Sequence, residues 1–223
     1  SMPEKLIVHG WWLKDDAKIS KSLGNTVALN ELVVKYQVDG IRYFLLRGIE
    51  LGEDGQFRED LLKAVVHGDL ANRYGNIFLR MLGIIELSFG GALPTGIINL
   101  KTREADELRK KIDRLHDSVD TLVDEPETVS EYVSRFMEAI VAINDYFQEN
   151  KIWEIENKLQ QAANLYFLMD MFRRATILAS PIIPGAADAV MKFLGFSECS
   201  MKYFDSNLPL EFVSQRPRLF PKI

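Results

Sequence analysis

Residues 59–89 read EDLLKAVVHGDLANRYGNIFLRMLGIIELSF, and apolar side chains recur along them at helical spacing, as at Leu70, Tyr74 and Phe78. Side chains three and four residues apart line one face of a helix, and an apolar face of this length needs a packing partner. The sequence GGALP at 90–94 ends the pattern. The stretch therefore predicts a long helix that buries one of its sides.

Further helices are predicted on the C-terminal side of this stretch. Apolar stripes at helical spacing cover residues 103–123, 128–147, 154–178 and 186–194, and prolines punctuate the remaining tail to residue 223. No internal repeat or low-complexity tract interrupts them. We expect a mainly α protein, built as a helical bundle of about five helices.

The N-terminal part has a different character. LIVHGWWL at 6–13 is short and rich in β-branched and aromatic residues, so we expect a strand that runs into a turn at Lys14-Asp15-Asp16. A polar loop over 18–25 and helices that begin near Leu29 and Asp39 follow. The glycine-rich stretch from 48 to 57 separates this short strand and loop segment from the bundle. We place the domain boundary there, giving domains 1–57 and 58–223.

The composition limits the classes of function. The chain has 47% hydrophobic residues and a net charge of −5, which is typical of a folded globular protein and argues against a basic surface that binds nucleic acid without preference. A local nucleic-acid site is compatible with it. No apolar run approaches the length of a membrane span. One cysteine, Cys199, with His9, His67 and His116 provides no disulfide and no metal-ligand spacing, so we expect no metal.

The sharpest local motif is KISKS at 18–22. Lys18 and Lys21 on a loop of small residues can contact a triphosphate, and Ser20 and Ser22 can donate hydrogen bonds to its oxygens. Such charges stabilise the negative charge that moves onto pyrophosphate when a nucleotidyl bond breaks. Taken alone, five residues of this kind are better interpreted as a solvated loop.

Two helical side chains and one tryptophan indicate a possible RNA site. Asn76 and Arg80 stand four residues apart and share a helix face, with Asn72 one turn earlier, so an amide and a guanidinium can contact the edge of an unpaired base. Trp153, in the link before a helix, can stack on such a base. Most Asn and Arg pairs on helices are only solvated, and most tryptophans are core anchors.

These motifs carry a resemblance to a known family. KISKS resembles the KMSKS signature of class I aminoacyl-tRNA synthetases, with Ile19 in place of methionine, and His9-Gly10 together with KISKSLGN is similar to the methionyl-tRNA synthetases in particular. The resemblance continues in the Y-x-x-D-x-x-R-Y-F-L pattern at 36–45 and in the D-L-x-N-x-x-G-N-x-x-x-R pattern at 69–80. It covers nearly the whole chain and is weakest over 100–145 and after 195.

The resemblance implies roles for the candidate residues. Lys18, Ser20, Lys21 and Ser22 would bind ATP, and the two lysines would be catalytic. Trp153 would stack on the CAU anticodon of tRNA(Met), while Asn76 and Arg80 would contact its cytosine. The HIGH motif of the family has no counterpart in the chain. We therefore expect the C-terminal part of a methionine–tRNA ligase, unable to activate methionine alone.

Several expectations follow from this interpretation. The complete enzyme would use ATP with magnesium and methionine, whereas this chain alone would hold no cofactor. We expect a monomer without a membrane partner, in the mitochondrial matrix or else the cytoplasm. The start at Ser1-Met2 resembles a cloning remnant. The alternatives are another class I synthetase with a helical anticodon domain, such as those for cysteine, leucine, isoleucine or valine, and a stand-alone helical RNA-binding or scaffold module.

Overall fold

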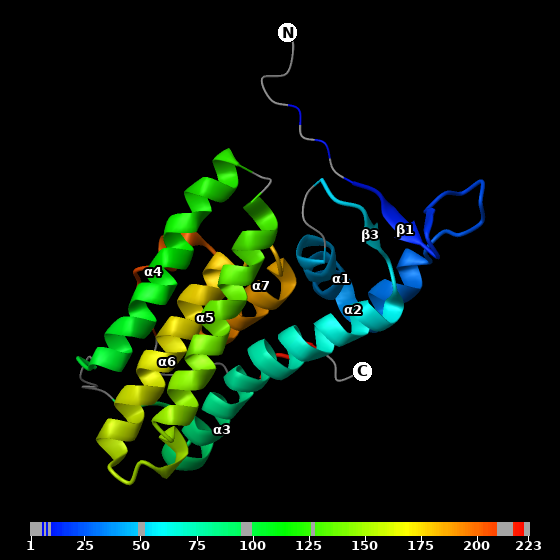
Figure 1. Ribbon diagram of the computed structural model, residues 1–223. Helices are drawn as coiled ribbons and strands as arrows, with labels where there is room; N and C mark the ends of the chain where they lie inside the picture. The colour runs from blue at the N-terminus through cyan, green and yellow to red at the C-terminus, as the bar shows by residue number, and fades with distance from the viewer. Residues whose placement is uncertain are drawn as a thin grey trace.

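The computed structural model describes residues 6, 8, 10–48, 52–94, 100–125, 128–208 and 216–220. It is mainly helical, with a small three-stranded sheet near the N-terminus, which confirms the predicted fold class (Figure 1). Among the helices that the structure describes, none has the length and apolar character needed to cross a bilayer.

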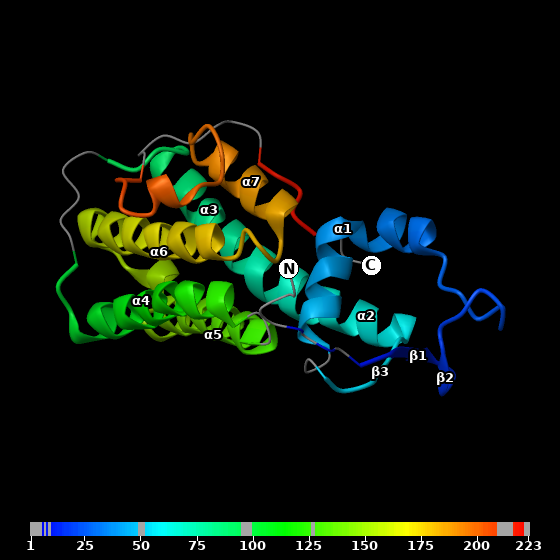
Figure 2. The same cartoon turned by 90° about the horizontal axis from the view of Figure 1, so that it is seen from above.

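One continuous helical rod joins the two parts of the molecule. It consists of α2 (Glu59–Val65), the π-helix η1 (Val66–Gly75) and α3 (Asn76–Phe89), and it ends at Gly90, whose φ of 64° suits a glycine. In Figures 1 and 2 the rod runs from beneath α1 to the far end of the bundle. The long helix predicted over 59–89 is confirmed. The π segment within it was not predicted, because apolar spacing does not distinguish it from an α-helix.

The bundle packs against α3. Its other helices are α4 (Arg103–Asp124), α5 (Val129–Glu149), α6 (Lys158–Leu178) and α7 (Pro184–Phe193). Figure 2 shows α4, α5 and α6 side by side, with α3 and α7 along the opposite side of α6. Aromatic rings fill the space between α3 and α6: Phe78 and Phe172 are both buried and stack at 5.1 Å between centroids. This stacking ties α3 to the middle of the bundle.

The N-terminal unit combines the sheet with α1 (Leu29–Arg47). Strand β1 (Trp12–Lys14) lies between β2 (Ala17–Lys18), which is antiparallel to it, and β3 (Gly55–Gln56), which is parallel. Helix α1 is kinked at Gln37, where φ is 61°, so its two halves are the two helices predicted from residues 29 and 39. A small apolar core joins α1 to the rod and includes Leu62 and Val66 from beyond the predicted boundary.

Several element boundaries differ from the prediction. The strand predicted at 6–13 begins only at Trp12, since pairing partners reach Trp12 to Lys14; residues 7 and 9 of that prediction lie outside the described residues. Lys18 lies in β2 rather than in a loop. The stretch from 48 to 57 contains β3, whose two residues are too few to show a strand period.

The helix predicted from Glu154 was wrong at its start. Ile152 is fully buried and anchors a 3₁₀ turn, η3 (Ile152–Glu154), so α6 begins four residues later, at Lys158. The Asn157 side chain caps it by accepting hydrogen bonds of 3.1 Å from the backbone of Leu159 and Gln160. Glu154 therefore lies in the 3₁₀ turn and outside α6.

Helix α5 begins without a side-chain cap. Thr128 stands at its N-terminus, but the Thr128 side chain makes no capping hydrogen bond. Its hydroxyl donates instead to the carbonyl of Glu125 at 2.8 Å. Both residues belong to the turn that precedes α5.

The second half of α1 is fastened to the bundle. The Asp39 carboxylate accepts hydrogen bonds from the backbone of Gly185 (3.2 Å) and Ala186 (2.6 Å), so it caps α7, and Arg42 donates to the carbonyl of Pro181 (2.8 Å). Tyr43 donates to Asp69 on η1 at 3.0 Å. Burial is the main cause that raises the pKa of Tyr43, with the Asp69 charge second.

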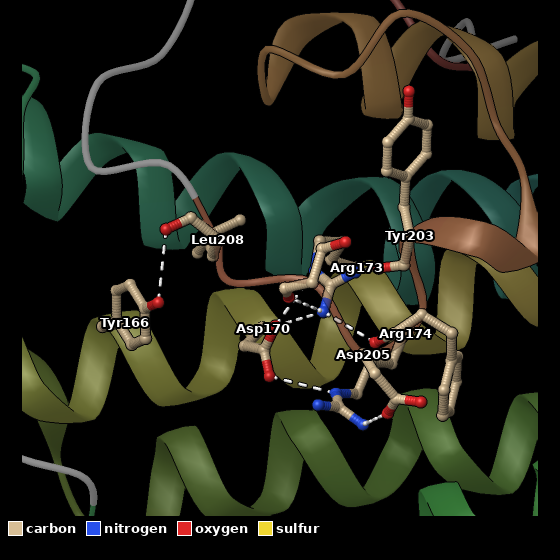
Figure 3. A network of polar contacts seen from close by, with 9 residues as sticks. Tyr166, Asp170, Arg173, Arg174, Tyr203, Asp205 and Leu208 are labelled. Carbon is tan, nitrogen blue, oxygen red and sulfur yellow. Dashed lines mark hydrogen bonds and ion pairs between the residues drawn. The ribbon is translucent and has the colours of Figure 1, made fainter.

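A buried arginine holds the segment after α7. Arg173 of α6 has no exposed surface, and its guanidinium donates to Asp170 and to the carbonyls of Tyr203, Phe204 and Ser206, as Figure 3 shows in part. Arg174 also pairs with Asp170, at 3.1 Å, so both arginines form ion pairs with one carboxylate of the bundle. The C-terminal segment is thereby bound to α6.

Candidate nucleic-acid interface

An exposed tryptophan marks the end of the bundle where α5 turns into α6. Lys151 adopts a positive φ of 43° there, and the turn places Ile152 in the core and the next side chain outside. Trp153 is 42% exposed. Its indole N–H donates a hydrogen bond to Glu154 Oε1 at 3.2 Å, and this bond restrains the orientation of the ring. Trp153 is thus available as a stacking platform and is no core anchor.

Arg80 of α3 lies beside this tryptophan. Its guanidinium carbon is 4.5 Å from the ring centroid of buried Phe147 and 5.7 Å from that of Trp153, and the two rings are 5.5 Å apart. When its amide oxygen faces the guanidinium, Gln148 accepts hydrogen bonds from Arg80 Nη1 (2.6 Å) and Nη2 (3.1 Å). Cation–π attraction to the two rings and the hydrogen bonds to the Gln148 amide hold the Arg80 guanidinium in place. The remaining N–H groups of the guanidinium stay available as hydrogen-bond donors.

The predicted amide residues lie on the same helix. Asn76 is exposed one turn before Arg80 on α3, and Asn72 is exposed on η1, where its Nδ2 lies 3.1 Å from His67 Nδ1. The structure therefore brings Arg80 and Trp153 together and places Asn76 on the face that leads to them. We name Asn76, Arg80 and Trp153, with the flanking Phe147 and Gln148, the α3–η3 surface.

The KISKS residues lie at the other end of the molecule, around β2. Lys18 Nζ is 3.1 Å from the ring centroid of the exposed Trp11, and the Ser20 and Ser22 hydroxyls are 2.7 Å apart. Asn25 shapes the loop, since its side chain accepts from the Ser20 backbone (2.8 Å) and donates to the Lys18 carbonyl (3.1 Å).

The loop is open to solvent. Lys18, Lys21 and Ser22 are exposed, and Ser20 is partly exposed, so two ammonium groups and two hydroxyls can meet a phosphate group. Within the described part of the chain, no three His, Cys, Asp or Glu side chains gather closely enough to hold a metal ion.

Comparison with known proteins identifies the family. The model described as tRNA synthetases class I (M) matches residues 1–82. The methionine–tRNA ligase of Caldanaerobacter subterraneus subsp. tengcongensis is 34% identical over 88% of this chain and 31% of its own length, and that of Campylobacter jejuni is 28% identical over 100% and 36%. The chain belongs to the class I methionyl-tRNA synthetase family. It spans about a third of the length of these curated relatives.

Solved structures of the family have the same fold. Mycobacterium tuberculosis methionyl-tRNA synthetase in complex with methionyl-adenylate superposes with a TM-score of 0.85 at 26% identity, over 96% of this chain and 43% of that one. The apo form of the same synthetase also gives 0.85, at 22% identity, over 100% of this chain and 44% of that one. The family's fold thus extends over the bundle, beyond the residues that the family model matches.

Sequence reasoning missed two contacts of the α3–η3 surface. Phe147 was assigned only to the predicted helix 128–147, and Gln148 was given no role. Neither has a motif of its own, and their contact with Arg80 arises only because the fold brings the C-terminal end of α5 next to α3. In the sequence, only the position of these two residues next to the link that contains Trp153 could have indicated that they belong to this surface.

Proposed function

We propose that this chain is the part of a methionine–tRNA ligase that reads the anticodon and carries the KISKS loop. The α3–η3 surface reads the CAU anticodon of tRNA(Met), and the loop contacts ATP in the complete enzyme. The division at residues 57 and 58, the monomeric state and the mitochondrial or cytoplasmic compartment belong to the same proposal. The observation that carries it is the exposed Trp153 ring with the Arg80 guanidinium beside it.

Anticodon reading follows from the donors and rings of this surface. An unstacked base lies on the Trp153 ring, because stacking on an aromatic side chain replaces the stacking lost in the loop. Arg80 then faces the edge of that base. Cytosine presents two adjacent acceptors, O2 and N3, whereas uracil has an N–H at position 3. A guanidinium only donates, so Arg80 favours cytosine. The Asn76 amide contains both a donor and an acceptor, so it forms hydrogen bonds with the remaining polar groups on the edge of the cytosine.

The KISKS loop acts on the other substrate. Lys18 and Lys21 lie against the phosphates of ATP, which enters as its magnesium complex, while Ser20 and Ser22 donate hydrogen bonds to phosphate oxygens. As methionine attacks the α-phosphate, negative charge grows on the departing pyrophosphate, and the two ammonium groups stabilise it. The relatives, about three times as long as this chain, support the view that the methionine site is formed by further residues of the protein.

Replacement of Trp153 tests the proposal. We expect Trp153→Ala to weaken binding of a tRNA transcript with a CAU anticodon by about 1 to 3 kcal/mol, or about 5- to 150-fold, because one stacked base is lost. Trp11→Ala is the matched control, since Trp11 is also exposed (53%) but directly precedes β1, which Figure 1 shows at the opposite end of the molecule from the C-terminal end of α3. Equal affinity of wild type and Trp153→Ala would refute the assignment.

Arg80 tests the specificity of the same surface. With Arg80→Ala, affinities for CAU and UAU anticodons should converge, since the edge contact is lost while the stacking ring stays in place. Titration of both transcripts against wild type and variant measures this ratio. A CAU preference that persists in Arg80→Ala would assign cytosine recognition to other residues.

A further inference from the structure

Gly83 lies in the middle of α3, where the described residues give no structural reason for a glycine. Its φ is not positive, and a Cβ built on it would meet no atom of the described residues within 4 Å, so neither the backbone conformation nor packing against these residues requires it. A glycine in a helix interior lowers helix stability relative to alanine. Alanine at this position would therefore make the folded protein more stable.

The position of Gly83 connects it to the α3–η3 surface. A helix turns about 100° per residue, so residues 76, 80, 83 and 87 fall within about 60° of one another around α3. Asn76 is exposed, Arg80 partly so, and Leu87 is 88% exposed. Helical side chains lean toward the N-terminus, so a side chain at 83 would cover the turn that carries Arg80. The glycine leaves that turn bare.

We propose that a nucleotide of the tRNA anticodon loop packs its sugar or base face directly on the α3 backbone at Gly83. This inference rests on the proposed function and extends it by one contact. The nucleotide is the neighbour of the base on Trp153, and Leu87 flanks it with an apolar side chain. The missing Cβ is what allows nucleic acid to approach the helix closely.

The proposal predicts opposite effects on stability and binding. Gly83→Ala should raise the melting temperature by about 2 to 4 °C, because alanine favours the helix. The same variant should weaken binding of the CAU transcript, and Gly83→Leu should weaken it more, since added atoms displace the nucleotide. Overpacking a close contact costs about 5- to 150-fold in affinity, with alanine at the low end and leucine at the high end.

Gly68 provides the matched control. It is a helical glycine of η1 whose Cβ would also meet none of the described atoms within 4 Å, and it lies about 20 Å earlier along the rod. Gly68→Ala and Gly68→Leu should leave tRNA affinity unchanged. Melting is followed by circular dichroism at 222 nm, and affinity by titration of labelled transcript at fixed salt concentration.

The outcomes separate the two proposals. Loss of affinity that grows from Gly83→Ala to Gly83→Leu, with no effect at Gly68, supports close approach at Gly83. Unchanged affinity in Gly83→Leu, beside clear loss in Trp153→Ala, overturns this inference and leaves the proposed function standing. A transcript whose binding depends on neither Trp153 nor Gly83 overturns both. A circular dichroism spectrum like that of wild type verifies that Gly83→Leu is folded.

Discussion

Replacement of Arg173 by methionine should lower the free energy of unfolding by about 3 to 4 kcal/mol. The guanidinium is fully buried and donates to Asp170 at 2.9 Å and 2.6 Å, to the carbonyls of Phe204 and Ser206 at 3.0 Å each, and to that of Tyr203. Methionine fills a similar volume but leaves these acceptors without the donor. Breaking a buried ion pair costs about 3 to 5 kcal/mol. Asp170 keeps Arg174, so we expect the lower part of that range.

Urea unfolding followed by circular dichroism measures this loss, with the slope against urea compared to verify that both proteins unfold in the same way. Arg174→Met is the control. Arg174 shares Asp170 but is 23% exposed, and its other partner, Asp205, is 89% exposed, so the cost should stay below about 1 kcal/mol. If Arg173→Met lowers the free energy of unfolding no more than Arg174→Met does, the carbonyls of the segment after α7 do not depend on the Arg173 guanidinium, and the prediction is refuted.

Three further predictions concern the cap, the loop and alkaline pH. Asp39→Ala should cost about 1 to 2 kcal/mol in urea unfolding, because α7 loses its cap; an unchanged midpoint would contradict this. In the complete enzyme, Lys21→Ala should lower methionine-dependent ATP–pyrophosphate exchange by about 10² to 10³ at saturating substrates, whereas weaker methionine binding at an unchanged rate would argue against a phosphate role. Burial raises the pKa of the Cys199 thiol from 9.0 to about 11, so the unfolded chain ionises first and stability falls from pH 9 to 11. Melting curves of wild type and Cys199→Ala should diverge over that window, and parallel curves would refute this.

The sequence predicts the helices because their apolar spacing is regular. The rod over 59–89 and the helices from 103 onward were found from this period, with glycines and prolines marking breaks, and the second half of α1 was found from Asp39 and Gly40, which were predicted to open a second helix. The sheet was predicted less well. β2 and β3 have two residues each, too few to show alternation, and β3 pairs with β1 only through contacts between distant parts of the chain.

The candidate site was predicted as far as local motifs reach. Asn76 and Arg80 share a face because four residues make about one helical turn, and this needs no tertiary structure. The proximity of Arg80 and Trp153 depends on how the fold brings η3 next to α3, which sequence spacing does not reveal, so it was reached through family resemblance. Phe147 and Gln148 lie outside any motif and were found only in the structure.

The unbroken rod from Glu59 to Phe89 also governs how the gene can change length. One residue gained or lost within it would turn everything downstream by about 100° and slide it by about 1.5 Å along the axis. An insertion after Leu62 would carry Ala186 of α7 away from Asp39, while Leu62 stayed in the core beside α1. A loop would absorb such a change, but a continuous helix transmits it. We therefore expect codon insertions and deletions to be tolerated less well within this stretch than in the loops.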